Sequence, residues 1–330
     1  ITGIGDNNVI KIPVDSNNKI DINALKKVLK EISEYNSRHH DTIKVISLIG
    51  IAGTTETGNI DDLMALRKIA DEYNIFFHVD AAWGGSVLLV NKYRDLFKGI
   101  EKADSVTFDA HKLLYSPLSM GLILFKNPYD LLNIMHTSDY IIRPDSVDQG
   151  RFTVEGSRPF SCLKPWVTLK IFGTTGFEVL FDHAFMLTST LKDVISKHEN
   201  FELLNTPELF ITNYRFVPEN IQNKINRIYE QLSNADQQKA TRLQKRLKKL
   251  NDGINEMNIE LHRAIRQEDN SFVSRTMLES TRYRGQKIVV LRAITINPLT
   301  TPAILQEIID EHNKLGLTIY HDFKNRLFHI

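Results

Sequence analysis

Residues 78–85 read His-Val-Asp-Ala-Ala-Trp-Gly-Gly, and residues 109–112 read Asp-Ala-His-Lys. Each stretch follows a short run of apolar and β-branched residues, 75–77 before the first and 105–108 before the second. Such runs are typical of strands. In an open α/β sheet, ligands bind just outside the carboxyl ends of the strands. We therefore expect both stretches to lie at the edge of the sheet where a ligand is held.

The two stretches supply complementary functional groups. Asp80 offers a carboxylate, the small Ala82 permits close approach, and Lys112 directly follows His111. A cofactor with an aldehyde and a protonated pyridine nitrogen needs a lysine for a Schiff base and an acid for the ring nitrogen. Taken singly, a His-Lys pair is a common surface feature, and an aspartate after a strand is often a helix cap or a turn residue.

Together, the motifs and their spacing resemble group II pyridoxal 5'-phosphate (PLP) amino-acid decarboxylases of fold-type I, and the resemblance runs through the whole chain. It implies an α/β fold with a doubly wound, mostly parallel sheet and a smaller carboxyl-terminal α+β domain. Residues 1–165 would form the carboxyl-terminal portion of the large PLP-binding domain, and residues 166–330 the small domain.

The hydrophobic pattern agrees with such a fold. Apolar runs and alternation predict strands at residues 8–14, 43–50, 75–78, 105–108, 121–125, 271–276 and 288–294. Helical spacing predicts helices at residues 22–29 behind an Asp21 cap, at 61–73, at 163–172 ending in Gly173, and at 302–315. Strand and helix alternate early in the chain, which favours parallel βαβ units.

The resemblance assigns roles around the cofactor. Asp80 would pair with the pyridine nitrogen, Ala82 would lie against the ring face, and Lys112 would form the Schiff base. His111 would lie beside this lysine, near the phosphate or the leaving carboxylate. Asp109 would shape the same loop, and a plain turn role is an equal alternative for it.

Three more cofactor contacts are implied by the resemblance. Thr55 would lie near the ring hydroxyl or the Asp80 carboxylate, although threonines in turns usually hydrogen-bond local backbone. Gly156 and Ser157 would approach the phosphate in the partner subunit. No metal ligand is expected.

Residues 136–151 are polar and aperiodic, and a loop of this length in a compact domain is usually functional or disordered. They resemble the family's mobile catalytic loop. Tyr140 matches the tyrosine that protonates the substrate carbon, and a surface tyrosine anchoring a flap is the alternative. Because this loop reaches the neighbouring subunit in the family, a homodimer with shared active sites is implied.

Arg292 lies in the apolar run 288–294 and matches the family arginine that binds a substrate carboxylate. A guanidinium suits this role because its fixed fork engages both carboxylate oxygens. An arginine in so apolar a strand is otherwise hard to satisfy, which favours function over a surface role.

The composition is that of an ordinary globular chain, with 330 residues, 42% hydrophobic and 25% charged, and is long enough for two domains. The 41 basic and 40 acidic residues nearly cancel, so no global field favours nucleic acid or an anionic membrane as partner. No apolar run approaches the roughly 20 residues of a membrane span. A single cysteine, Cys162, fits a reduced cytoplasmic location, and we expect it to be buried.

Residues 218–270 differ in composition from the rest of the chain. Leu243, Leu247 and Leu250 recur at helical spacing within a segment crowded with Gln, Lys and Arg, which predicts an amphipathic, charged helical hairpin. A basic helix can bind nucleic acid or a membrane surface. Because Glu and Asp residues dilute this one, a solvated face is the preferred interpretation.

The chain begins at Ile1 without a methionine. Members of the family carry an upstream stretch that supplies part of the phosphate site and a histidine that stacks on the ring. None of the 11 histidines is in a matching position. We therefore expect this chain to be the carboxyl-terminal part of a larger enzyme.

The resemblance implies PLP-dependent decarboxylation of a small L-amino acid. Residues 272–276 and 297–301 look closest to aspartate 1-decarboxylase-like proteins, so aspartate (to β-alanine) is the first candidate substrate and glutamate (to GABA) the second. A 2,4-diaminobutyrate decarboxylase, another fold-type I lyase or an aminotransferase is an alternative. A catalytically silent fragment that serves as a dimerisation or regulatory module is an alternative of another class.

Overall fold

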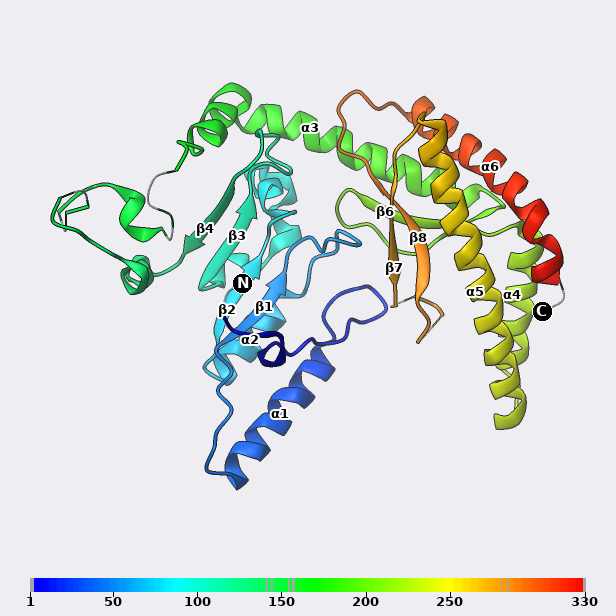
Figure 1. The fold of residues 1–330 in the computed structure, drawn as a ribbon, viewed down its shortest axis with the longest axis horizontal. Coiled ribbons are helices and arrows are strands. Elements are labelled where there is room, and N and C mark those ends of the chain that lie inside the picture. The colour runs from blue at the N-terminus through cyan, green and yellow to red at the C-terminus, as the bar shows by residue number, and fades with distance from the viewer. Residues whose placement is uncertain are drawn as a thin grey trace. The chain divides into compact units, whose positions relative to one another are not determined.

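The computed structural model describes residues 3–140, 142–143, 145–153, 155, 158–279, 281–283 and 285–328. The chain forms two compact units (Figure 1). The first comprises Ile1–Pro13, Ile20–Thr54 and Ile60–Glu178, and the second comprises Val14–Lys19, Thr55–Asn59 and Val179–Ile330. The domain limits expected at residues 165 and 166 stay a prediction.

A four-stranded sheet organises the first unit. Its order is β1 (Ser47–Ile51), β2 (Phe76–Asp80), β3 (Ser105–Asp109) and β4 (Gly121–Phe125). The first three strands run parallel, and β4 is antiparallel to β3. This arrangement confirms the α/β fold with a mostly parallel sheet.

Helix α2 (Leu63–Glu72) connects β1 to β2 and covers the sheet. Its carboxylate cap is Asp62, which accepts a hydrogen bond from the Ala65 N–H, as the acidic start of the predicted helix indicates. Leu66 is fully buried and lies so close to Gly50 that a Cβ at this glycine would come within 2.8 Å of a Leu66 methyl carbon. The glycine thus allows close helix–strand packing.

The remaining helices of the first unit are short or peripheral. Asp21 caps α1 (Ile22–Arg38) by accepting from the Asn23 and Ala24 N–H groups, as predicted. The 3₁₀ helices are η1 (Asp6–Asn8), η2 (Gly85–Leu89), η3 (Asn91–Phe97), η4 (Ile100–Lys102), η5 (Pro128–Ile134) and η6 (Gln149–Phe152).

An antiparallel sheet organises the second unit, in the order β5 (Phe201–Leu203), β6 (Ile211–Phe216), β8 (Ile288–Ile294) and β7 (Ser274–Leu278). Its helices are the part of α3 (Leu163–Lys197) from Val179 onward, α4 (Glu219–Leu232), α5 (Gln237–Glu268) and α6 (Pro302–Phe328). Helix α5 packs against β8 and α6. Helices α4 and α5 lie in the segment 218–270 that was predicted to be helical, and α6 continues beyond the expected end at residue 315.

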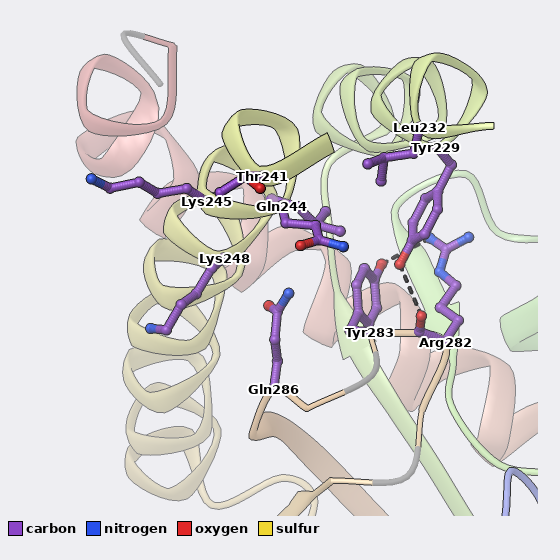
Figure 2. Close-up of a pocket in the computed structure, with 10 residues that line it drawn as sticks. Tyr229, Leu232, Thr241, Gln244, Lys245, Lys248, Arg282, Tyr283 and Gln286 are labelled. Carbon is purple, nitrogen blue, oxygen red and sulfur yellow. Dashed lines mark hydrogen bonds between the residues drawn. The ribbon is translucent and has the colours of Figure 1, made fainter. Parts of the chain in front are cut away.

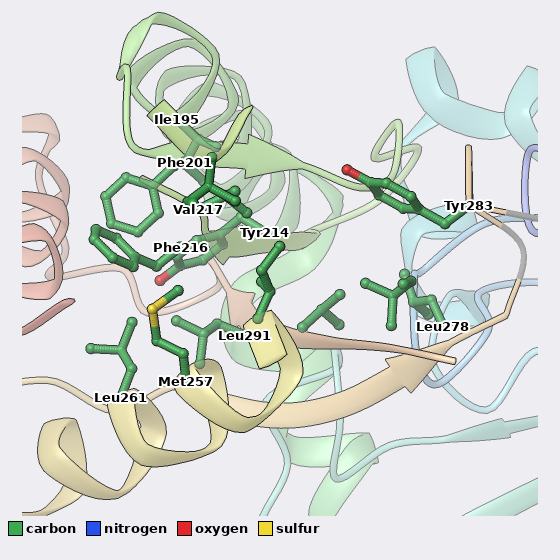
Figure 3. Close-up of a cluster of buried hydrophobic side chains, with 14 of the residues drawn as sticks. Ile195, Phe201, Tyr214, Phe216, Val217, Met257, Leu261, Leu278, Tyr283 and Leu291 are labelled. Carbon is green, nitrogen blue, oxygen red and sulfur yellow. The ribbon is translucent and has the colours of Figure 1, made fainter. Parts of the chain in front are cut away.

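The core of the second unit lies between this sheet and its helices (Figure 3). Tyr214 and Phe216 of β6 meet Met257 and Leu261 of α5, and all four are fully buried. Asn258 is buried among them, and its side chain accepts from the Phe216 N–H and donates to the Phe216 carbonyl, both at 2.8 Å. The asparagine therefore satisfies backbone groups that the apolar core could not.

Two expectations need correction. Residues 9–13 form no strand, and Val9 is 57% exposed. The helix predicted at residues 163–172, by contrast, does end at Gly173: within α3 (Leu163–Lys197) the backbone leaves helical geometry there, at φ 58° and ψ −174°, and a second helical segment follows the kink. Cys162 is exposed just before α3, not buried.

Within the described residues, no helix is long and apolar enough to cross a membrane, and no group of three or more His, Cys, Asp or Glu side chains could hold a metal ion.

Gly53 generates a first prediction, because it follows β1 at φ +105° and its missing Cβ would lie 2.9 Å from the Gly84 nitrogen. We expect Gly53→Ala to lower the free energy of unfolding by roughly 2–4 kcal/mol, from backbone strain and from a clash with backbone that cannot yield. The matched control is Gly285→Ala, at φ +74° with nothing within 4 Å, which should cost only about 1 kcal/mol. Urea unfolding measures both, and equal losses would contradict the clash.

Buried His312 generates a second prediction. Its Nδ1 lies 2.9 Å from the Tyr214 hydroxyl and its Nε2 lies 3.0 Å from Ser271 Oγ. Burial lowers the pKa of His312 to about 4 from its ordinary 6.5. Between these pH values the unfolded chain binds more protons than the folded chain, so stability is present above pH 6.5 and is lost as the pH falls toward 4.

About 3 kcal/mol of stability depends on this one group. Urea unfolding at several pH values from 7 to 4 should show a smaller pH dependence in His312→Gln than in the unmodified chain. His39→Gln, at an exposed histidine, is the control. An unchanged slope in the His312 variant would refute the assignment.

Candidate active site

The carboxyl ends of β2 and β3 meet at one edge of the parallel sheet. Asp80 ends β2 in register with Thr107 of β3. The connection continues beyond the strands, because the Ala81 N–H donates to the Thr107 carbonyl at 2.8 Å and the Asp109 N–H donates to the Ala82 carbonyl at 3.2 Å. The two sequence motifs are thus joined through their backbones, at the edge where the sequence analysis expected them.

Asp80 is half-buried at this edge, and its Oδ1 accepts a hydrogen bond from the Ala82 N–H at 3.0 Å. This bond fixes the carboxylate at the end of the strand and uses one of its several acceptor sites. Ala82 is itself half-buried, with only a methyl group as side chain. The carboxylate can therefore accept a further bond from a bound cation or N–H group.

Lys112, Asp109 and His111 form a second cluster in the turn after β3. Lys112 Nζ lies 2.9 Å from Asp109 Oδ2, and His111 Nε2 lies 3.8 Å from the same oxygen. His111 Nδ1 is within hydrogen-bond distance of both the Met120 carbonyl (2.8 Å) and the Met120 nitrogen (3.1 Å). One carboxylate thus holds the lysine, and the backbone before β4 holds the histidine.

His78 lies two residues before Asp80 on β2 and was not among the predicted site residues. Its Nδ1 lies 2.7 Å from Ser105 Oγ and its Nε2 lies 3.3 Å from Thr107 Oγ1. Burial lowers the pKa of His78, and the nearby Asp80 carboxylate opposes this. The signal was present, because polar residues two apart on each strand must share one face of the sheet.

Tyr140 lies in a loop whose base is closed by the His136 N–H, which donates to the Arg151 carbonyl at 2.9 Å. Tyr140 is 85% exposed, so in this chain it is not packed against the edge that holds Asp80 and Lys112. Gly156 and Ser157, the other two predicted residues of this region, lie outside the described residues.

Thr55 and Arg292, both predicted site residues, meet in the second unit. Arg292 Nε donates to the Thr55 carbonyl at 2.8 Å, and Arg292 Nη1 lies 3.3 Å from Ser274 Oγ. Burial lowers the pKa of Arg292, and the Glu56 carboxylate opposes this. The guanidinium is therefore oriented by neighbours on β7 and on the loop after β1, and part of its donor capacity is used for structure.

The residues at the sheet edge fit PLP. The cofactor needs an anionic partner for its pyridinium nitrogen and an amine for its aldehyde. Asp80 provides a fixed, half-buried carboxylate, and Lys112 provides an amine from the neighbouring strand end. Ala82 keeps the space beside this carboxylate open.

Comparisons with known proteins agree with this fit. Residues 2–217 match the family model described as the pyridoxal-dependent decarboxylase conserved domain. The aspartate 1-decarboxylase of Aliivibrio fischeri is 36% identical over 316 residues, which cover 96% of this chain and 54% of that protein. The L-2,4-diaminobutyrate decarboxylase of Acinetobacter baumannii is 31% identical over 223 residues, which cover 66% of this chain and 42% of that protein.

Solved structures show the same fold. The crystal structure of mouse CSAD superposes with a TM-score of 0.75 at 26% sequence identity, covering 95% of this chain and 60% of that chain. The glutamate decarboxylase domain of a Vibrio parahaemolyticus protein gives a TM-score of 0.71 at 22% identity, over 96% of this chain and 55% of that chain, and is evidence of the fold alone. These likenesses confirm the predicted fold-type I architecture.

The chain spans about half the length of the curated relatives it matches. The matched family model is that of pyridoxal-dependent enzymes, which confirms the expected cofactor, PLP. With this model matching residues 2–217 and with a relative 36% identical over nearly the whole chain, the protein belongs to the pyridoxal-dependent decarboxylase family.

Proposed function

We propose that this chain carries the cofactor lysine and ring-binding acid of an enzyme that removes the α-carboxylate of a small L-amino acid. The observation that supports this most is the placement of Asp80 and Lys112 at the ends of two adjacent parallel strands. When bound, PLP supplies the electron sink that stabilises the carbanion left by departing carbon dioxide. The protein's own residues hold the cofactor, orient the substrate and protonate the substrate carbon.

Asp80 holds the ring nitrogen in its protonated form. A half-buried carboxylate favours a cationic partner because opposite charges a few ångström apart stabilise each other more strongly away from water. The bond from the Ala82 N–H keeps Asp80 Oδ1 in place, so the carboxylate does not have to reorganise when the cofactor's ring nitrogen binds.

Asp109 positions the lysine. Its ion pair with Lys112, at 2.9 Å, keeps the amine at the end of the sheet. Asp109 Oδ2 also lies 3.8 Å from His111 Nε2, so one carboxylate is close to both side chains. We assign Asp109 to the positioning of Lys112, and His111 to a place beside this lysine, near the phosphate or the leaving carboxylate.

Tyr140 is proposed as the acid that protonates the substrate carbon. Its 85% exposure supports a role that is completed only when the loop moves or meets a second subunit. The homodimer with shared sites, in which Gly156 and Ser157 approach the partner's phosphate, is part of this proposal, as is a cytoplasmic location.

Arg292 is proposed to bind a carboxylate of the substrate, which favours an acidic amino acid. A guanidinium already oriented by the Thr55 carbonyl and Ser274 Oγ loses little entropy when it binds an anion. Similarity to an aspartate 1-decarboxylase over nearly the whole chain supports aspartate, giving β-alanine, ahead of glutamate, giving GABA. Other relatives are named for 2,4-diaminobutyrate, cysteine sulfinic acid and aromatic amino acids. The test of this proposal must therefore include amino acids of all these kinds as substrates.

The cofactor assignment predicts a covalent adduct on one lysine. Borohydride reduction of the chain with PLP, followed by peptide mass spectrometry, should find pyridoxyl-modified Lys112, and Lys112→Ala should lose this adduct completely. Lys98→Ala, which removes an exposed lysine of the same unit, should leave it unchanged. Modification spread over many lysines, or none at Lys112, would refute the assignment.

The substrate assignment predicts a selective effect of Arg292. In a carbon dioxide release assay, Arg292→Gln should raise KM for aspartate or glutamate by about tenfold or more, because one charge-assisted contact contributes about 1.5–3 kcal/mol. The adduct at Lys112 should be retained. Arg275→Gln, at an exposed arginine on β7, is the matched control. Release from aromatic or basic amino acids alone would rule out an acidic substrate.

A further inference from the structure

The hairpin formed by α4 and α5 contains a cavity of about 500 Å³ that the decarboxylase site does not use. Its lining includes Lys224 and Arg227 of α4 and Arg246 of α5. The other lining residues are the carboxamides Asn220, Asn223 and Gln231 and the apolar Ile221 and Ile228. The lining residues of this cavity, all within the described part of the chain, include no Asp or Glu.

Two of the cations in this cavity repel each other. Lys224 is half-buried, and its pKa is lowered by burial and by the charge of Arg246. Both effects disfavour the charged ammonium. No ion pair between described residues includes Arg227. Three cations on two helices thus line one cavity, and an anion bound there would relieve the repulsion between Lys224 and Arg246.

A larger cavity, of about 610 Å³, lies elsewhere in the same unit and differs in character. Figure 2 shows its two lysines, Lys245 and Lys248, pointing away from Tyr283 and Gln286. Lys248 Nζ is 2.7 Å from Asp252 Oδ2. Arg282, also in its lining, pairs with buried Glu202 at 2.6 Å. Two of the three cations that line this second cavity, Lys248 and Arg282, thus form ion pairs with carboxylates.

We propose that the 500 Å³ cavity binds a small multivalent anion, one that carries a phosphate group or several carboxylates. Lys224, Arg227 and Arg246 contact its oxygens, and the amide groups of Asn223 and Gln231 donate to it. The arginine fork matches both phosphate and carboxylate geometry. The volume lies within the roughly 300–1,000 Å³ of small-molecule sites.

Calorimetric titration of the full chain at low salt tests this site, with pyrophosphate and citrate as separate probes. We expect saturable binding of at least one of them, and the stronger probe distinguishes a phosphate site from a carboxylate site. The double variant Arg227→Gln/Arg246→Gln should weaken binding at least tenfold. The control Arg242→Gln/Lys249→Gln removes the same charge from exposed positions of α5 outside the cavity and should change binding less than twofold.

Equal weakening by both double variants would overturn the proposal, because it would indicate diffuse attraction to the helix surface. Absence of saturable binding by either probe would also overturn it. So would binding of a 12-nucleotide single-stranded DNA with no binding of the small anions, since the hairpin would then be a macromolecular surface. The PLP adduct at Lys112 should be unchanged in both variants, so failure here is distinguishable from failure of the decarboxylase assignment.

Discussion

The pairing of β2 with β3 is the constraint on which the candidate site depends. The register places Asp80 opposite Thr107, and the backbone bonds from Ala81 and Asp109 extend the pairing into both loops. A slip of one residue would turn Asp80 to the opposite face of the sheet, because side chains alternate along a strand. The acid and the lysine are therefore held together by main-chain geometry, with no direct bond required between them.

The polar side chains around this edge are also positioned by the strand pairing. His78 and Asp80 alternate with the buried Val79 on β2, while Ser105 and Thr107 alternate on β3. The polar residues consequently share one face and satisfy one another, and Val79 packs on the other. In the second unit, bonds to the Thr55 carbonyl and Ser274 Oγ fix the orientation of the Arg292 guanidinium.

The sequence predicted most elements of this fold because local pattern and tertiary role coincide in them. Residues 121–125 and 288–294 are apolar runs that became β4 and β8, and Asp21 and Asp62 cap the helices they precede. Residues 8–14 show the limit of such reasoning, since alternation makes a strand only where another strand offers pairing. Gly173 is the opposite case, because the backbone leaves helical geometry at this glycine, where the sequence predicts the end of a helix.

Contacts between residues far apart in the chain could not be predicted from the sequence pattern. Nothing local reveals that Asn258 would bond the backbone of Phe216, or that Asp109 rather than another acid would hold Lys112.

The distribution of charge over the folded chain is likewise not predicted by the composition. A net formal charge of +1 for the whole chain removes the case for a general attraction to polyanions, yet it says nothing about how the charges are distributed. Lys224, Arg227 and Arg246 concentrate positive charge in one cavity of a nearly neutral protein. Because the potential at a cavity depends mainly on charges within about one Debye length, roughly 8 Å at physiological ionic strength, the proposed anion site depends on this local cluster and not on the net charge.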